Sequence, residues 1–288
     1  MSAKMLNPID WLPRLPLGDG VDALIEWLRA TIGFLTRLIS EFLGSFMSGF
    51  ADILLFLPPF ILIILIALLA WRFSNYKVAL FSLIGLILIY NMELWEAAII
   101  TITMILISVL ISIAIGLPVG IISTRSDLVH RIVWPILDFM QTMPAFVYLI
   151  PAVFFFRLGV VSAMIATVVF SMPPVIRLTG LGIRLVSEEA VEAATAFGST
   201  DWQKLTKVQL PLAMPTIMAG INQCIMLALS MVVIAAMIGA GGLGAIVLRG
   251  IQRLDIGLGF ESGLAVVIVA IILDRITQST KQQAASEE

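Results

Sequence analysis

The chain has 288 residues, of which 60% are hydrophobic and only 12% are charged, and its mean hydropathy is +1.08. Soluble domains carry about 25% charged residues, so this composition predicts a protein whose solvent is largely lipid. The net charge of −2 excludes the basic footprint of a nucleic-acid-binding protein. A single cysteine, Cys224, and a single histidine, His130, argue against a disulfide framework and against a His/Cys metal site.

Long apolar stretches mark the helices that we expect to cross the membrane. The N-terminus has no secretory signal pattern, so the first long helix is expected to act as its own insertion signal. Pro58-Pro59 and Pro173-Pro174 are expected to break or bend their helices. The sequence predicts an all-α fold, a polytopic transmembrane helical bundle, with seven spans over Ile53–Trp71, Val78–Met92, Ala97–Thr124, Ile132–Phe156, Leu158–Ile176, Val208–Ile238 and Ile256–Leu273.

Basic residues between these spans predict the orientation, because cytoplasmic loops carry an excess of Lys and Arg. One side of the membrane receives three of them, Arg157, Arg249 and Arg253. The other side receives ten, which are Arg72, Lys77, Arg125, Arg131, Arg177, Arg184, Lys204, Lys207, Arg275 and Lys281. The side with ten is therefore expected to be cytoplasmic, which places the C-terminus inside and the N-terminus outside.

The chain divides into four expected regions. Residues 1–52 form an external N-terminal region, in which polar residues recur at helical spacing between Val21 and Phe50. This pattern predicts an amphipathic helix that lies on the membrane surface or packs against the spans. Residues 53–92 supply two peripheral spans, residues 93–278 form a core of five spans, and residues 279–288 form a cytoplasmic tail.

The hydrophilic loop before the sixth span is the most informative segment. Ser187 can cap a helix whose first turn holds Glu188 and Glu189, and Gly198 can end that helix. Thr200 or Asp201 can start a second short helix. We expect a compact knob on the cytoplasmic side over residues 187–207, after which Pro211 opens the next membrane helix.

The spacing in this loop resembles a known family. Glu192-Ala193-Ala194, three residues, Gly198, nine residues and then Val208-Gln209-Leu210-Pro211 is similar to the signature cytoplasmic loop of ABC importer permeases, with Val208 in place of the commoner isoleucine. The resemblance implies the type I ABC importer permease fold. It also implies that the loop is a coupling helix that docks on an ATPase subunit, through Glu192, Ala193, Ala194, Gly198, Leu210 and Pro211.

Further segments resemble the glycine betaine, proline betaine and choline branch of that family. The similarity extends over about residues 90 to 278, and it is carried by Gln141–Leu149, Pro173–Thr179, Lys207–Gly220, Leu227–Ala235 and Gly241–Gly244. Some members of the branch carry a fused binding domain after the last span. Because this sequence stops shortly after Arg275, we expect a separate binding protein.

The resemblance implies an assembly of two permease subunits, two ATPases and an external binding protein in a bacterial inner membrane. No Gly-Lys dipeptide occurs, so the chain has no P-loop of its own. We expect no cofactor on this chain, with ATP and Mg²⁺ on the partner ATPase, and no enzymatic activity in the chain itself. Pairing of the permease with a second copy of itself is the expected arrangement.

Polar groups at membrane depth are the candidates for a solute pathway. An aspartate in the membrane costs roughly 3 kcal/mol to insert, which marks Asp138 as a functional candidate unless it reaches water at its helix end. The other candidates are Gln141, Thr142, Tyr148, Asn222, Gln223 and Ser230. The glycines Gly239, Gly241, Gly242 and Gly244 match a dinucleotide-binding fingerprint, but they follow a membrane helix rather than a strand, so we interpret them as a hinge, an outer gate or a packed turn.

Three other functions are alternatives to the import of a quaternary ammonium osmolyte. An intramembrane enzyme would need a nucleophile beside a base, and Cys224 and His130 offer no such pair. A secondary transporter would predict inverted internal repeats, which the sequence does not show. The third alternative is an ABC importer of another small solute, such as methionine, a different amino acid or a sulfonate. Only the resemblance of the segments that flank the loop argues against it.

Overall fold

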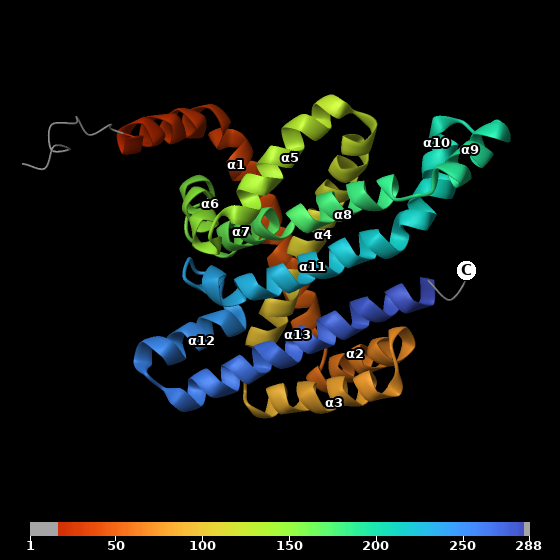
Figure 1. Ribbon diagram of the computed structural model, residues 1–288. Coiled ribbons are helices and arrows are strands. Elements are labelled where there is room, and N and C mark those ends of the chain that lie inside the picture. The colour runs from red at the N-terminus through yellow and green to blue at the C-terminus, as the bar shows by residue number, and fades with distance from the viewer. Residues whose placement is uncertain (1–16, 285–288) are drawn as a thin grey trace, which may run out of the picture.

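The computed structural model describes residues 17–284, and within that range all regular secondary structure is helical (Figure 1). This confirms the predicted all-α class. Helices are the expected solution in lipid, because a helix satisfies its backbone hydrogen bonds within one segment. The elements are α1 (Leu17–Phe56), α2 (Pro59–Phe73), α3 (Tyr76–Asn91), α4 (Trp95–Arg125), α5 (Asp127–Thr142), η1 (Ala145–Tyr148), α6 (Leu149–Phe156), α7 (Val160–Ser171), α8 (Pro173–Arg184), α9 (Glu188–Ala196), α10 (Asp201–Lys204), η2 (Leu205–Gln209), α11 (Leu210–Ala236), α12 (Gly242–Arg253) and α13 (Ile256–Ala284).

Five helical segments are long and apolar enough to cross a membrane, and a sixth is possible if a bent pair forms one crossing. They are Gly18–Phe56, Trp95–Arg125, Val160–Arg184, Asp201–Ala236 and Ile256–Gln278. The peripheral helices α2 and α3 have 15 and 16 residues. At 1.5 Å per residue they are shorter than the roughly 30 Å hydrocarbon layer. The count of seven spans therefore stays a prediction.

The segment Ile132–Phe156 corrects the sequence interpretation of one continuous span. The chain instead forms α5, a short η1 turn and α6, with a bend of 115° between the two parts. Pro144 explains the break, because a proline disfavours the helical conformation of the residue before it. Met143 accordingly has an extended backbone, with φ −75° and ψ 135°.

The prolines at 173 and 174 bend a helix but do not end it. α7 stops at Ser171, and α8 begins at Pro173 in the first turn, where the missing N–H of a proline is tolerated. Val160–Arg184 consequently forms one span-length segment, which corrects the expected end at Ile176.

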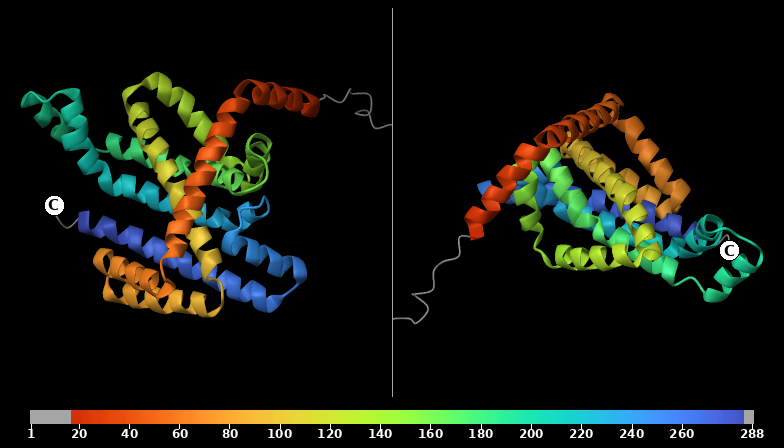
Figure 2. Two further views of the ribbon diagram at one scale, coloured as in Figure 1. Left: turned by 180° about the vertical axis from the view of Figure 1, so that it is seen from behind. Right: turned by 90° about the horizontal axis from the view of Figure 1, so that it is seen from above.

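The N-terminal helix is longer than the amphipathic segment predicted from Val21 to Phe50. α1 is continuous from Leu17 to Phe56 and includes the residues expected to open the first span. Its N-terminal part projects away from the bundle, and the remainder lies against α4, α6 and α7 (Figure 2). Its position on the membrane surface stays a prediction, because by length and composition this helix could also cross the membrane.

The two ends of the bundle differ in charge. α9 and α10 protrude at one end, beside the end of α13 and the α2–α3 turn (Figures 1 and 2). That end carries Arg72, Lys77, Arg125 and Arg184, whereas the α6–α7 turn and the end of α12, at the opposite end, carry Arg157, Arg249 and Arg253. The fold thus separates the two sets of basic residues that the sequence assigned to different sides of the membrane.

Glycines let three helices of the core approach closely. Gly116 and Gly120 lie four residues apart on α4, the small-residue spacing typical of packed membrane helices. A Cβ atom built on Gly120 would lie 2.7 Å from Thr179 Cβ and 2.9 Å from the Ile176 carbonyl oxygen on α8. On the other side of α8, a Cβ on Gly220 of α11 would lie 2.9 Å from the Pro174 carbonyl oxygen. α4, α8 and α11 are therefore held in direct backbone contact.

This contact predicts that Gly120→Ala destabilises the protein by about 1–3 kcal/mol, because the added methyl group cannot fit without displacing the α8 backbone. Gly263→Ala on α13 is the matched control, since nothing lies within 4 Å of its Cβ position. We expect the control to unfold at the wild-type temperature or slightly above it. Thermal unfolding in detergent measures both, and equal melting temperatures for the two variants would contradict the close packing.

Candidate coupling loop and solute pathway

The loop between α8 and α11 folds as the predicted knob. The Ser187 hydroxyl accepts a hydrogen bond from the Ala190 amide at 3.4 Å and caps α9, and no residue of α9 is buried. Gly198 follows the helix with φ +77°, a conformation that L side chains rarely adopt. Nothing lies within 4 Å of its Cβ position, so the requirement for glycine comes from the backbone rather than from crowding.

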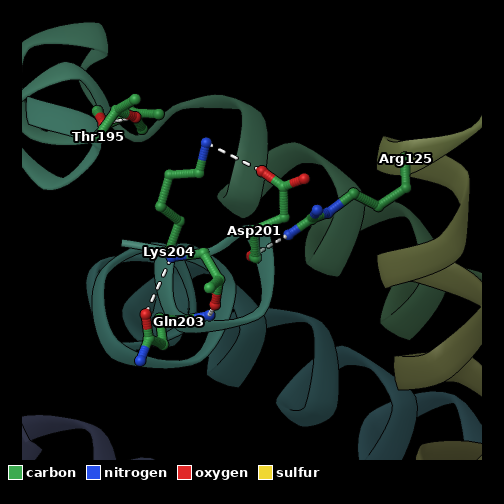
Figure 3. Close-up of polar contacts among 7 residues, drawn as sticks. Arg125, Thr195, Asp201, Gln203 and Lys204 are labelled. Atoms are coloured by element: carbon green, nitrogen blue, oxygen red, sulfur yellow. Dashed lines mark hydrogen bonds and ion pairs between the residues drawn. The ribbon is translucent and has the colours of Figure 1, made fainter. Parts of the chain in front are cut away.

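The second short helix is capped at its first turn. The Thr200 hydroxyl accepts a hydrogen bond from the Gln203 amide, and the Gln203 side chain accepts one from the Thr200 amide at 2.9 Å. This reciprocal capping box satisfies two backbone donors that a helix start leaves free. Figure 3 shows Gln203 in the first turn of α10, next to Asp201 and Lys204. The sequence prediction of a helix starting at Thr200 or Asp201 is confirmed.

A polar contact joins the knob to the long helix α4. Arg125 Nη2 donates a hydrogen bond to the Asp201 carbonyl oxygen at 2.9 Å, and Lys204 Nζ lies 3.0 Å from Asp201 Oδ1 (Figure 3). Asp201 belongs to the exposed knob, outside the membrane part of α11. The hydrogen bond from Lys204, together with its positive charge, lowers the pKa of the Asp201 carboxyl.

The knob is also continuous with a membrane helix. Asp201–Ala236 forms one uninterrupted helical segment, in which Leu205–Gln209 has the wider π-helical winding. The Leu210 amide donates to the Leu205 carbonyl oxygen, five residues back, one residue before Pro211. Pro211 thus lies at the start of the α-helical part, as predicted, but no break separates knob and span. Leu205 is buried against Ile183, Ala213 and Ile217, which fixes the connection to α8 and α11.

A polar cleft of about 580 Å³ separates α9 from the ends of α4 and α8. Its lining mixes both charges, with Arg125, Arg184 and Lys204 facing Glu188, Glu192 and Asp201. Glu192, expected at the ATPase contact, therefore lines a cleft shared with the rest of this chain. The neighbouring Ala193 is exposed, and Ala194 is half-buried.

The candidate pathway residues fall into separate groups. Asp138 forms an ion pair with Arg177 and is 64% exposed, and Gln141 and Thr142 are exposed on the same helix, α5. The Tyr148 side chain is buried, and its hydroxyl donates to the Met140 carbonyl oxygen. These four residues lie on α5 and η1. Asp138 pairs with Arg177 of α8, and the Thr142 hydroxyl donates to the Phe139 carbonyl oxygen within its own helix.

The three candidates on α11 point in two directions. Asn222 accepts a hydrogen bond from the Thr277 hydroxyl of α13 at 3.4 Å, so it takes part in helix packing. Gln223 and Ser230 are exposed on one face, seven residues apart, with Met226 between them. The sequence prediction that 223 and 230 share a face while 222 points elsewhere is confirmed.

The glycine-rich segment after α11 is tightly held. The Gly159 amide donates to the Ile238 carbonyl oxygen at 2.8 Å, and the Leu243 amide donates to Thr101 Oγ1 at 2.8 Å. Gly239, Gly241 and Gly242 have positive φ, and a Cβ on Gly242 or Gly244 would overlap Thr101 or the Val232 backbone. In this conformation the segment is a packed turn at the end opposite α9, and its role as a hinge or gate stays a prediction.

The comparisons with known proteins agree with this geometry. Residues 116–279 match the family "Binding-protein-dependent transport system inner membrane component". A glycine betaine transport system permease protein of Bacillus subtilis is 53% identical over 273 residues, which cover 95% of this chain and 97% of that protein.

The chain belongs to this family.

Other relatives are similar over nearly the whole permease. A glycine betaine/carnitine transport permease protein of Listeria monocytogenes is 50% identical, covering 96% of this chain and 99% of that protein. A glycine betaine/proline betaine transport system permease protein of Escherichia coli is 46% identical, covering 94% of this chain and 77% of that protein. The chain is thus the permease subunit of an ABC transport system. It works with an ATPase and a substrate-binding partner, and ATP hydrolysis belongs to the separate ATPase.

A solved structure supports the fold. A chain of the methionine ABC transporter MetNI, crystallised in inward-facing conformations, superposes with a TM-score of 0.58 at 23% identity, covering 67% of this permease and 95% of that chain. This likeness confirms the type I importer permease fold that the loop resemblance implied. At this level of identity it carries no information on the solute.

Sequence reasoning missed two aromatic side chains in the knob. Phe197 and Trp202 are 89% and 71% exposed, and they lie on either side of Gly198. Large exposed aromatics in a hydrophilic loop are typical of interface anchors. The sequence did contain a signal for this contact surface, because two aromatic residues stand in a loop that is otherwise rich in Glu, Ala and Thr.

The capping box predicts that Thr200→Ala loosens the knob. Loss of an N-cap costs about 1 kcal/mol, which corresponds to roughly fivefold faster hydrogen exchange of the α10 amides. Thr195→Ala is the control, because Thr195 lies inside α9 and its hydroxyl bonds only to the Val191 carbonyl oxygen, one turn back. Hydrogen–deuterium exchange of the purified transporter measures both variants, and unchanged exchange in Thr200→Ala would contradict a role for the cap.

Proposed function

We propose that this permease imports a quaternary ammonium osmolyte, namely glycine betaine, proline betaine or choline. The observation that carries the proposal is the 46–53% identity, over nearly all of the chain, to three permeases whose names include glycine betaine. A quaternary ammonium group has no N–H proton to lose and keeps its charge at every pH, so its recognition depends on aromatic faces rather than on a counter-ion alone. We assign that recognition mainly to the external binding protein.

The assembly we propose contains two copies of this permease, two ATPases and one external binding protein in the bacterial inner membrane. ATP and Mg²⁺ bind to the ATPases. The C-terminus and the α9 end face the cytoplasm, and the N-terminus faces outward. The separation of basic residues between the two ends of the bundle supports this orientation.

The knob transmits motion of the ATPases to the membrane. We assign the docking contact to the exposed surface formed by Ala193, Phe197, Gly198 and Trp202. Because α10, η2 and α11 form one helical segment, a displacement of the knob must move α11. The hydrogen bond from Arg125 to Asp201 passes part of the same displacement to α4. Glu192 acts within the cleft beneath α9, and Leu210 and Pro211 maintain the continuity into the span.

The solute path in this proposal follows the exposed face of α11 that carries Gln223 and Ser230, and Asp138, Gln141, Thr142 and Tyr148 border the path from α5 and η1. The face is apolar apart from these groups, with Met226 and Met237 also exposed on it. A second permease copy across this face would enclose the path. Asn222 contributes through its bond to α13, and Gly239, Gly241, Gly242 and Gly244 close the outer end of the path.

Docking through the knob predicts that Trp202→Ala uncouples the complex. An aromatic anchor contributes at least about 2 kcal/mol to an interface, so ATPase binding is expected to weaken roughly thirtyfold. Phe197→Ala is expected to act in the same direction. The measurement is binding-protein-stimulated ATP hydrolysis in proteoliposomes that contain the permease and its ATPase.

Trp27→Ala is the matched control for that experiment, because Trp27 is 62% exposed on α1, far along the chain from the knob. The control should retain stimulated hydrolysis. Normal stimulation in both Trp202→Ala and Phe197→Ala would remove the knob from the ATPase contact.

The solute assignment predicts ATP-dependent uptake of radiolabelled glycine betaine, proline betaine or choline by proteoliposomes that contain the permease, its ATPase and its binding protein. Methionine should not be taken up, and a proton ionophore should have no effect. Uptake of methionine alone would identify an amino-acid importer. Uptake that needs no ATP and stops with the ionophore would identify a secondary transporter.

A further inference from the structure

An apolar groove opens on the periphery of the bundle, between the α2–α3 hairpin and the core. It has a volume of about 280 Å³ and lies between α1, α2, α4 and α13. Every side chain that lines it is aliphatic or aromatic, and none is polar. On α2 the lining residues are Leu62, Leu65, Ile66 and Leu69, which form one face of the helix.

The opposite wall repeats the same periodicity. On α13 the lining residues are Val269, Ile272, Leu273 and Ile276. Both helices run toward the α9 end of the molecule (Figures 1 and 2), so the two rows form parallel walls. Leu62 is buried and closes the groove near the start of α2. Leu65 and Leu69, further along the same helix, are partly exposed, so the groove is open to the surroundings there.

An apolar cavity of this size does not hold ordered water, because water needs polar partners there. An unfilled groove would also forfeit the dispersion contacts of its walls. The surroundings of a short peripheral hairpin in a membrane protein are lipid tails. A flexible hydrocarbon chain therefore fits the groove in both shape and chemistry.

A basic side chain lies where the groove meets the membrane surface. Arg72 follows Leu65 by seven residues and Leu69 by three, so it continues the same face of α2 by one further turn. Its guanidinium is exposed at the last turn of the helix and lies 5.8 Å from the centre of the Phe73 ring. A guanidinium at this level is complementary in charge to a lipid phosphate.

We propose that this groove is a binding site for a membrane phospholipid, with one acyl chain between α2 and α13 and the phosphate at Arg72. The lipid comes from the leaflet at the α9 end. It fills the space between the hairpin and the core, and it attaches α2 and α3 to the rest of the permease. The site is independent of the solute pathway and of the ATPase contact.

The test is photo-crosslinking of the intact transporter in vesicles of phosphatidylcholine and phosphatidylglycerol. The probe is phosphatidylglycerol with a diazirine on one acyl chain, and mass spectrometry locates the labelled residues. Val267 and Ile271 lie on the exposed face of α13 and report the ordinary lipid shell. We expect at least fivefold more label at Leu273 and Ile276 than at Val267 and Ile271. Equal labelling of the two faces would overturn the proposal.

Two pairs of variants sharpen the result. Leu69→Trp fills the groove and should reduce its labelling severalfold, whereas Leu68→Trp, which faces the outer side of the hairpin, should not. Phosphatidylglycerol has a net negative charge, whereas the choline cation neutralises the phosphate of phosphatidylcholine, so the wild type should favour the phosphatidylglycerol probe over a phosphatidylcholine probe with the same acyl chains. Arg72→Glu should remove that preference. Lys77→Glu, at the other side of the same turn, should keep that preference. If Leu69→Trp and Arg72→Glu leave the labelling as unchanged as their controls do, the lipid contact is unspecific. If a variant fails to fold, the comparison of the two α13 faces in the wild type decides the question.

Discussion

The direct backbone contact of α4, α8 and α11 is the constraint on which the rest of the structure depends. Lipid tails are as apolar as leucine, so membrane helices gain little by burying apolar side chains and associate instead through close packing. Gly120 and Gly220 remove the side chains that would keep α8 away from its two neighbours. The helices on either side of the knob are thereby fixed to each other, and motion of the knob moves a connected unit.

The knob combines a rigid base with an exposed tip. Leu205 is buried between α8 and α11, and Arg125 reaches the α10 backbone from α4, so the base has three attachments to the membrane helices. Beyond it, α9 buries no residue, and Phe197 and Trp202 face outward. In the proposed coupling, a displacement of the tip would therefore pass into α11 through the continuous helical segment α10–η2–α11.

The periphery follows a different principle. α2 and α3 are short, and they leave an apolar groove against α1 and α13 instead of packing fully. A bound lipid would complete this part of the fold, so that the bilayer contributes to the structure as well as surrounding it. Close contacts at glycines hold the core helices together, whereas the proposed lipid would fill the space between the α2–α3 hairpin and the core.

The sequence by itself determined the membrane class, the helical fold, the cap at Ser187, a second helix start at Thr200 or Asp201 and the family signature of the loop, because each depends on local composition or on spacing within about 20 residues. Only the tertiary structure decided the bend at Pro144, the continuation of α7 into α8 and the uninterrupted helix through Leu205–Gln209. A proline can end, bend or start a helix, and its neighbours in space select among these outcomes. The separation of Asn222 from the α5 residues, the position of Glu192 in a cleft and the exposure of Phe197 and Trp202 likewise depend on contacts between segments far apart in the chain, which periodicity alone does not contain.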